Sequence, residues 1–277
     1  MSLVEGDRTF TTPTRSDLAR GSAELATYVP RLTVQWLRDG PERRWLEVHG
    51  TLAFIDISGF TSMSEKLSSV GRAGAEEVTE VMNATFAALL QVAYEQGGGL
   101  LKFGGDALLL LYDGEDHAAR AARAAFEMRR TLRAIGRPRT SAGAIQLKMH
   151  AGLHSGQFQF FLVGESHREL LVTGPAGTRT VEMESASEAG EILLSPETAA
   201  ELDPSTLGDE KGAGRLLQAA PEVSGSLEPL PDLVGTRVAD ECDCGVAVLS
   251  FERSYLEQLR AQRRRHCDLD RQPDEIG

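Results

Sequence analysis

Short apolar runs alternate along the chain with longer stretches in which apolar residues recur at helical spacing. The apolar runs predict strands over residues 51–56, 100–103, 107–112, 145–154, 157–163, 169–174 and 190–195. The helical spacing predicts helices over residues 21–38, 74–96, 116–135 and 176–188, and a short one over 196–202. From residue 51 the order is strand, helix, strand, strand, helix, strand, with further strands after it. This order predicts an α+β fold with a ferredoxin-like βαββαβ core and extra strands.

The two ends of the chain are more polar than its middle, which sets the expected domain limits. Residues 1–20 are rich in Thr, Arg and Ser, and we expect them to be disordered. Residues 21–47 are predicted to be an N-terminal helical segment, with Pro30 in a first helical turn. The βαββαβ core is expected over residues 48–202. Residues 203–277 begin with a stretch rich in Gly, Pro, Ser and acidic residues, and are predicted to be a linker and a C-terminal tail.

Charge and composition narrow the classes of function. The formal net charge of −12 argues against a nucleic-acid partner, because phosphate backbones bind basic surfaces. No stretch reaches the roughly 18 apolar residues that a membrane span needs. The N-terminus lacks the basic and apolar regions of a signal peptide. We therefore expect a cytoplasmic protein with no membrane span.

The C-terminal cysteines and the arginines of one predicted helix can each be interpreted in more than one way. Cys242, Cys244 and Cys267 lie near the C-terminus and, with His266, could form a zinc site. The second pair lacks the usual ligand spacing, so a tail with reduced cysteines is the favoured interpretation. The arginines of the helix over 116–135 are interpreted as a solvated helix face.

Two aspartates stand where strands meet glycine-bearing turns. Asp56 ends the first strand, and Asp106 follows the two glycines of the hairpin turn. In a ferredoxin-like sheet the first strand lies beside the central hairpin, so both carboxylates are expected at one edge. Close carboxylates repel unless a cation neutralises them, and Mg²⁺ is usually held by carboxylates and substrate phosphates. The pair predicts a metal site, although each aspartate alone would more simply cap its turn.

Residues after Asp56 fit the same site. Gly59 leaves room for a phosphate to approach backbone N–H groups before the next helix. The backbone carbonyl of Ile57 is a candidate for a further metal ligand. A pair of metals would activate a ribose hydroxyl and stabilise a leaving pyrophosphate.

Two segments resemble the signature segments of class III adenylyl and guanylyl cyclases. They are Phe54-Ile55-Asp56-Ile57-Ser58-Gly59-Phe60-Thr61 and Gly98-Gly99-Leu100-Leu101-Lys102-Phe103-Gly104-Gly105-Asp106. The segments Gly152-Leu153-His154-Ser155-Gly156 and Gly190-Glu191-Ile192-Leu193-Leu194-Ser195 resemble later landmarks of the family. The likeness covers roughly residues 48–200. It is closest to the first of the two cyclase domains of soluble, bicarbonate-responsive adenylyl cyclases and their bacterial relatives.

The resemblance implies a cyclase domain over residues 48–202 whose active site forms at a dimer interface. One partner supplies two metal-binding aspartates, which map onto Asp56 and Asp106, with Ile57 acting through its backbone. The implied cofactors are two Mg²⁺ or Mn²⁺ ions, and the implied substrate is a nucleoside triphosphate, with ATP favoured. The implied nucleotide-binding positions are Gly59, Phe60, Thr61, Lys102 and Thr178. Lys102 stands where the base-reading lysine of the family is expected.

The sequence departs from the family in the other half of that site. Aligned on the glycine before the second helix, a second base-reading position falls on Leu171, the ribose-orienting Asn on Thr178 and the transition-state Arg on Glu182. Leu171 cannot accept a hydrogen bond through its side chain. Glu182 places an anion where negative charge develops on phosphate. Arg179 is a candidate to replace the missing transition-state arginine. It lies three residues, or about one helical turn, before position 182, which changes how far its guanidinium reaches.

Three functions remain open from the sequence. The first is one half of a cyclase that needs a second cyclase domain to complete its active site. That second domain is a further copy of this chain or, as the sequence favours, a different and complementary domain. The second is a degenerate cyclase fold that binds nucleotide or a partner and regulates. The third is an interaction domain without ligand, which the intact Asp56 and Asp106 pair disfavours.

Overall fold

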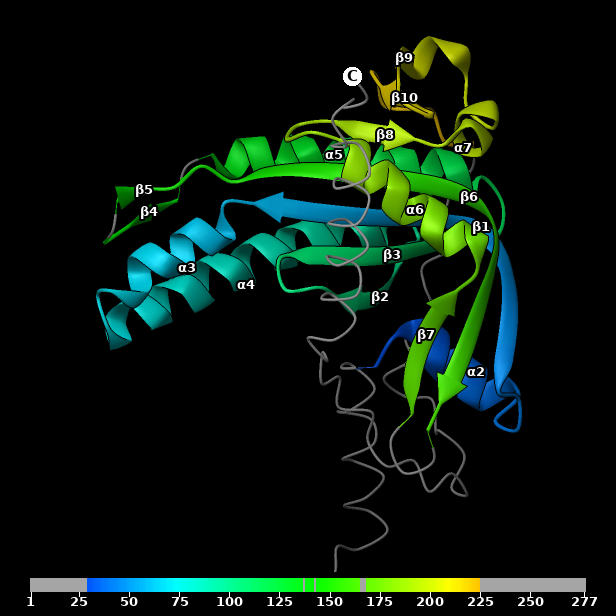
Figure 1. Cartoon of the computed structure of the whole chain (residues 1–277), viewed down its shortest axis with the longest axis horizontal. Helices are drawn as coiled ribbons and strands as arrows, with labels where there is room; N and C mark the ends of the chain where they lie inside the picture. Colours follow the sequence, from blue (N-terminus) through cyan, green and yellow to red (C-terminus); the bar gives the residue numbers. More distant parts are fainter. Residues whose placement is uncertain (1–28, 137, 142, 165–167, 225–277) are drawn as a thin grey trace, which may run out of the picture.

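The computed structural model describes residues 29–136, 138–141, 143–164 and 168–224 (Figure 1). The predicted disordered segment 1–20 lies outside the described residues. So do the first part of the predicted helix over 21–38 and the cysteines Cys242, Cys244 and Cys267 with His266.

The described helices follow the predicted order with two additions. They are α2 (Arg31–Asp39), α3 (Phe60–Ser68), α4 (Arg72–Glu95), α5 (His117–Ile135), α6 (Pro175–Ala186), α7 (Pro196–Ala200) and the 3₁₀ helix η2 (Pro204–Thr206). Pro30 is the residue that precedes α2, not part of its first turn. Helix α3 begins four residues after Asp56, and neither α3 nor η2 was predicted.

The strands build one large sheet and a small separate pair. They are β1 (Trp45–Ser58), β2 (Gly99–Phe103), β3 (Ala107–Asp113), β6 (Lys148–Val163), β7 (Glu169–Thr173), β8 (Ile192–Leu194), β9 (Leu207–Lys211) and β10 (Gly214–Leu217), with β4 (Arg139–Thr140) and β5 (Gly143–Ala144) apart. Within the described residues the large sheet has the order β2-β3-β1-β6-β8-β10-β9, and β7 pairs with β6. The antiparallel order β2-β3-β1-β6 with crossover helices α4 and α5 confirms the ferredoxin-like core.

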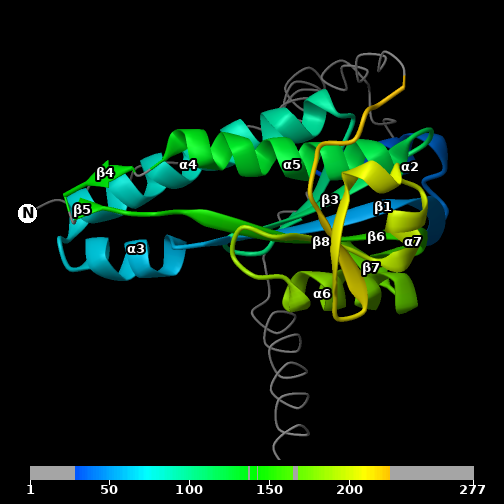
Figure 2. The same cartoon turned by 90° about the horizontal axis from the view of Figure 1, so that it is seen from above.

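The sheet has two unequal faces, and Figure 2 shows α4 and α5 on one of them and α6 on the other. The larger core lies under α4 and α5 and includes Ile55, Ile57, Leu89 and Met128. Successive side chains of a strand point to opposite faces. Asp56, between the two buried isoleucines, therefore points to the opposite face, on which α6 lies.

A smaller core lies where β1 and β6 curve away from the rest of the sheet, beside β7 and α2 (Figure 1). Its buried members are Trp36, Leu52, Leu101, Leu111, Phe158, Phe160, Leu162 and Leu170. The predicted helix over 21–38 thus packs on the sheet through its described part, α2.

Two predictions on the elements were wrong. The two strands expected over 145–154 and 157–163 are one strand, β6, which runs beside β1 along its whole length. The predicted linker begins too early, because η2, β9 and β10 follow residue 203 and β10 pairs with β8. Residues 225–277 lie outside the described part of the chain.

The arginines of α5 do more than face solvent, which corrects the interpretation of a solvated face. Arg120 is 5% exposed and donates to the carbonyl oxygens of Asp113, Glu115 and Gln96. Arg129 donates to the carbonyl of Gly190 over 3.1 Å. Charge-assisted bonds to carbonyls tie this helix to the loops around it.

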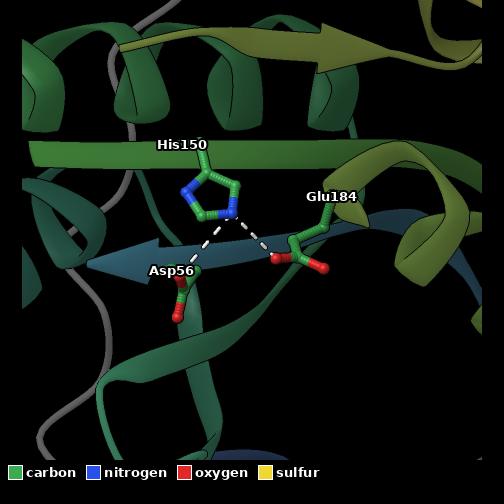
Figure 3. Close-up of side chains that lie close together, drawn as sticks. All are labelled: Asp56, His150 and Glu184. Atoms are coloured by element: carbon green, nitrogen blue, oxygen red, sulfur yellow. Dashed lines mark hydrogen bonds and ion pairs between the residues drawn. The ribbon is translucent and has the colours of Figure 1, made fainter. Parts of the chain in front are cut away.

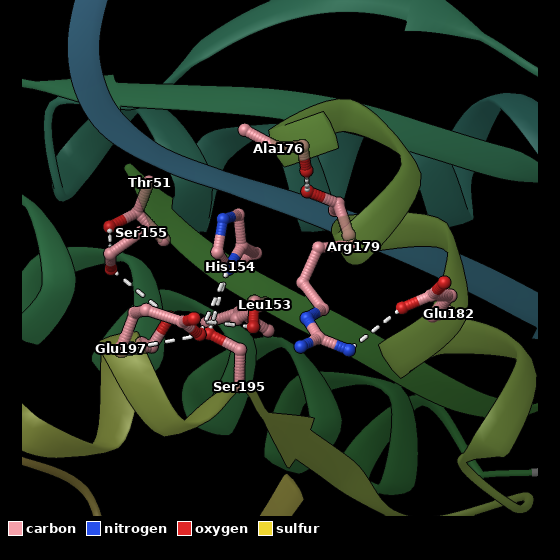
Figure 4. Close-up of polar contacts among 11 residues, drawn as sticks. Thr51, Leu153, His154, Ser155, Ala176, Arg179, Glu182, Ser195 and Glu197 are labelled. Atoms are coloured by element: carbon pink, nitrogen blue, oxygen red, sulfur yellow. Dashed lines mark hydrogen bonds and ion pairs between the residues drawn. The ribbon is translucent and has the colours of Figure 1, made fainter. Parts of the chain in front are cut away.

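Buried hydroxyls and an imidazole fix α7 against the sheet. Thr51 Oγ1 lies 2.8 Å from Ser155 Oγ, and Ser155 donates to Thr198 over 3.1 Å. His154 Nδ1 lies 2.9 Å from Ser195 Oγ (Figure 4). Burial lowers the pKa of His154, so the neutral imidazole is favoured in the folded state.

Helix α6 can approach β6 only because position 152 is glycine. A Cβ atom at Gly152 would lie 2.0 Å from the backbone nitrogen of Glu184. We predict that Gly152→Ala lowers the free energy of unfolding by about 3 kcal/mol, because the helix must move away from the strand. Chemical denaturation followed by circular dichroism measures this change.

Gly177→Ala is the matched control within α6. A Cβ atom there would lie 3.5 Å from Val172 Cγ1, an ordinary contact, and alanine favours the helix by up to about 1 kcal/mol. Equal stability of the two variants would contradict the close approach of α6 to β6.

Candidate active site

Asp56 and Asp106 lie at the same end of the β1–β3 pair, as predicted. Asp56 is the cross-strand partner of Ala107, and the Ile57 N–H donates to the Asp106 carbonyl over 3.1 Å. The turn before Ala107 is closed by Gly104 and Gly105, and Gly105 has a positive φ of 74°. Strand pairing therefore places two partly buried carboxyl-bearing residues side by side.

The residues after Asp56 form the start of α3. Gly59 has a φ of 112°, and a Cβ atom there would lie 2.8 Å from the Gln146 carbonyl oxygen, so glycine is required. The Phe60 side chain is buried against Phe86, so only its backbone N–H is offered to a ligand. Thr61 is exposed, and its hydroxyl lies 3.5 Å from Asp106 Oδ2. The structure thus brings Thr61 to one of the predicted metal-binding residues.

A histidine and a glutamate meet Asp56 on the face under α6 (Figure 3). His150 of β6 is the cross-strand partner of Asp56, with Nε2 3.6 Å from Asp56 Oδ2. The same nitrogen lies 3.0 Å from Glu184 Oε1 of α6. Sequence reasoning missed both residues. The β1–β6 register that pairs Asp56 with His150 has no local sequence signal.

Lys102, the expected base-reading lysine, lies on β2. Its ammonium nitrogen is 2.6 Å from Glu169 Oε1 at the start of β7. The side chains of Lys102 and Glu169 are 16% and 35% exposed, so this ion pair is partly shielded from solvent. Glu169 is a third residue that sequence reasoning missed. It lies two residues before Leu171, on the same face of β7.

The positions where the sequence departs from the family lie on β7 and α6. Thr178, in the first turn of α6, is exposed, and its N–H and hydroxyl both point to the Gly174 carbonyl. Arg179 and Glu182 form an ion pair of 2.9 Å along the helix (Figure 4). Leu171 is partly buried in β7 opposite Phe161. The structure does not bring these four residues together with Asp56 and Asp106 in a described contact.

The comparisons with known proteins decide the family. Residues 48–215 match the adenylate and guanylate cyclase catalytic domain. The chain belongs to this family. The match runs past the predicted limit at residue 202 and includes β9 and the start of β10. Catalytic domains of this family dimerise, bind nucleotides and use divalent metals.

Relatives of both nucleotide specificities are similar to the chain. Human adenylate cyclase type 10 is 29% identical over 177 residues, which are 62% of this chain and 11% of that protein. The membrane guanylyl cyclase of Dictyostelium discoideum is 27% identical over 196 residues, which are 69% of this chain and 12% of that protein. The chain thus spans only a small part of the curated relatives it matches.

A solved structure supports the fold. The guanylyl cyclase domain of the RhoGC fusion protein from Blastocladiella emersonii superimposes with a TM-score of 0.52 at 22% identity. The match covers 65% of this chain and 99% of that domain. No helix among the described residues is both long and apolar enough to cross a membrane.

The position of Asp56 beside Asp106 leads to a first test of the site. We predict that Asp106→Ala abolishes Mg²⁺- or Mn²⁺-dependent binding of nucleoside triphosphate, because one of two neighbouring carboxylates is lost. Isothermal titration calorimetry with ATP and each metal measures the binding. Asp113→Ala, an exposed carboxylate at the other end of β3, is the control and should bind normally. Unchanged binding by Asp106→Ala would remove this residue from the site.

Proposed function

We propose that this chain contributes the metal-binding half of a dimeric cyclase site that converts ATP to cyclic AMP and pyrophosphate. The ribose 3′-oxygen attacks the α-phosphorus, the bond to the pyrophosphate oxygen breaks, and the 3′-hydroxyl proton is lost. The observation that supports this proposal is the position of Asp56 and Asp106 side by side at one end of β1 and β3.

The residues at this edge fit magnesium or manganese. The carboxylates of Asp56 and Asp106, the Ile57 carbonyl and the Thr61 hydroxyl form an all-oxygen donor set, which these ions prefer. When bound, two such ions would lower the barrier by stabilising the attacking and leaving oxygens. The backbone N–H groups at the start of α3, after Gly59, would donate hydrogen bonds to a phosphate oxygen.

The pairing of Arg179 with Glu182 supports the need for a partner. A cation that stabilises developing phosphate charge must be available to the substrate, but the guanidinium of Arg179 is held by a carboxylate 2.9 Å away. Loss of a preorganised charge of this kind costs roughly 3–4 kcal/mol, or about a hundred-fold to a thousand-fold in rate. Two copies of this chain would therefore form two weak sites. A complementary domain with Asn and Arg would form one strong site with Asp56 and Asp106.

The choice of ATP rests on weaker support. Lys102 lies where the family resemblance expects contact with a purine, and human adenylate cyclase type 10 is among the similar proteins. A guanylyl cyclase is similar over a comparable length. Both nucleotides therefore belong in every assay.

A second candidate function is a regulatory module that binds nucleotide without turning it over. Two observations favour it. The Lys102 ammonium is already paired with Glu169, and Glu182 stands at the position where the family resemblance expects a cation. This module would bind the metal and the triphosphate through Asp56 and Asp106 but would release no pyrophosphate.

A mixing experiment tests the proposal. The purified chain is assayed for cyclic nucleotide from ATP and GTP with Mn²⁺, alone and with a cyclase domain that supplies Asn and Arg. That partner carries alanine at its own two metal-binding aspartates, so any complete site must use Asp56 and Asp106. We predict activity in the mixture at least about a hundred-fold above the chain alone.

Control measurements show whether the activity of the mixture uses the metal-binding residues of this chain. Asp56→Ala in this chain should remove the activity of the mixture. Activity of the chain alone at the level of the mixture would contradict the half-site. Absence of activity in both, with nucleotide binding intact, would favour the regulatory module.

A further inference from the structure

The cluster around His150 has the composition of a metal site that differs from the all-oxygen site above. Its three donors are Asp56 Oδ2, His150 Nε2 and Glu184 Oε1, and these atoms all lie within 4.8 Å of one another. Nε2 lies 3.0 Å from the glutamate oxygen and 3.6 Å from the aspartate oxygen. Donor atoms about 2.1 Å from one ion are separated by about 3–3.5 Å, so small side-chain movements would let all three reach it.

Three elements of the fold hold the donors in place. Asp56 and His150 are partners across the β1–β6 ladder, and Glu184 comes from the last turn of α6 (Figure 3). Gly152, two residues beyond His150 on the same face of β6, lets the backbone of α6 rest on the strand at Glu184. The glutamate position is therefore fixed by a close backbone contact and not by a flexible loop.

The cluster is sheltered but open enough for an ion to enter. The side chains of Glu184, His150 and Asp56 are 14%, 17% and 27% exposed. Partial burial limits the solvation of the two carboxylates and strengthens their attraction for a cation between them.

The donor types select among metals. One imidazole nitrogen with two carboxylate oxygens suits Zn²⁺, Mn²⁺, Fe²⁺ or Co²⁺, whereas Mg²⁺ favours oxygen donors alone. We propose that Asp56, His150 and Glu184 bind a divalent transition-metal ion, with Zn²⁺ preferred over Mg²⁺. If the proposed cyclase function is right, the shared Asp56 makes an ion in this site compete with the catalytic metals.

Direct metal titration of the full chain tests this proposal without any nucleotide. The metal-free protein is titrated with Zn²⁺ by calorimetry, and with Co²⁺ by its visible absorption. We expect His150→Gln and Glu184→Gln to lose one bound ion per chain, or to bind it about 100-fold more weakly. Changing groups outside the direct ligands already costs about 10–100-fold in such sites.

Glu182→Gln is the matched control, since Glu182 lies on the same helix, is 53% exposed and pairs with Arg179. This variant should bind both metals as the wild type does. Circular dichroism melting confirms that each variant is folded. Unchanged stoichiometry and affinity in folded His150→Gln and Glu184→Gln would overturn the proposal.

Asp106→Asn separates this proposal from the proposed function. The variant should keep the Zn²⁺ site and lose Mg²⁺-dependent nucleotide binding, because Asp106 belongs only to the all-oxygen site. Loss of nucleotide binding with Zn²⁺ binding lost as well would contradict the assignment of Zn²⁺ to the His150 cluster. Failure of nucleotide binding in the wild type would leave the Zn²⁺ result valid by itself.

Discussion

Strand β1 lies between β3 and β6, and the chemistry of the domain depends on the register of these two pairings. Fourteen residues of β1 pair with β6, and residues 50–56 of the same strand also pair with β3. This arrangement places Asp56 opposite Ala107 on one side and His150 on the other. A shift of one residue would turn Asp56 into the larger core and bring Ile55 or Ile57 to the open face. The burial of these isoleucines, both 0% exposed, stabilises the register that presents the carboxylate.

The two faces of the sheet have different roles: one holds the larger core and the other holds the candidate site. The face under α4 and α5 carries the larger apolar core together with the buried hydrogen-bonded pair Thr51 and His117, whereas the face under α6 carries Asp56, His150 and Glu184. Helix α6 reaches this face because Gly152 has no side chain. The same helix pairs Arg179 with Glu182 on its exposed surface. Helix α6 thus places the Glu184 carboxylate beside Asp56. It also carries Thr178 and Glu182, the departures from the family that make a complementary partner necessary in the proposed function.

Much of the fold could be predicted because its apolar pattern is local. The hairpin of β2 and β3, the helices α4 and α5 and the order of the core all follow from runs and spacings in the sequence. Residues 155 and 156 were predicted to separate two strands, but β6 continues through them because Gly156 pairs with Gly50 of β1. Residues 207–217 are rich in glycine and charge, and they form strands because β10 pairs with Leu193 and Leu194 of β8. In both cases tertiary pairing overrides local propensity.

The candidate site was predictable only in part, for a similar reason. Asp56 ends one apolar run and Asp106 directly precedes another, so strand order alone was enough to bring them together. His150 and Glu184 have no such signal, because their meeting depends on the β1–β6 register and on a helix that rests on Gly152. The Lys102–Glu169 pair likewise joins two strands, β2 and β7, that are not neighbours in the sheet.

The most direct test of the central claim is to locate the metal. Crystals grown with Mn²⁺ and a non-hydrolysable ATP analogue, with the complementary domain present, would give an anomalous signal at the manganese positions. The account predicts manganese bound by both Asp56 and Asp106 and by the triphosphate. A bound nucleotide whose metals contact neither aspartate would contradict it.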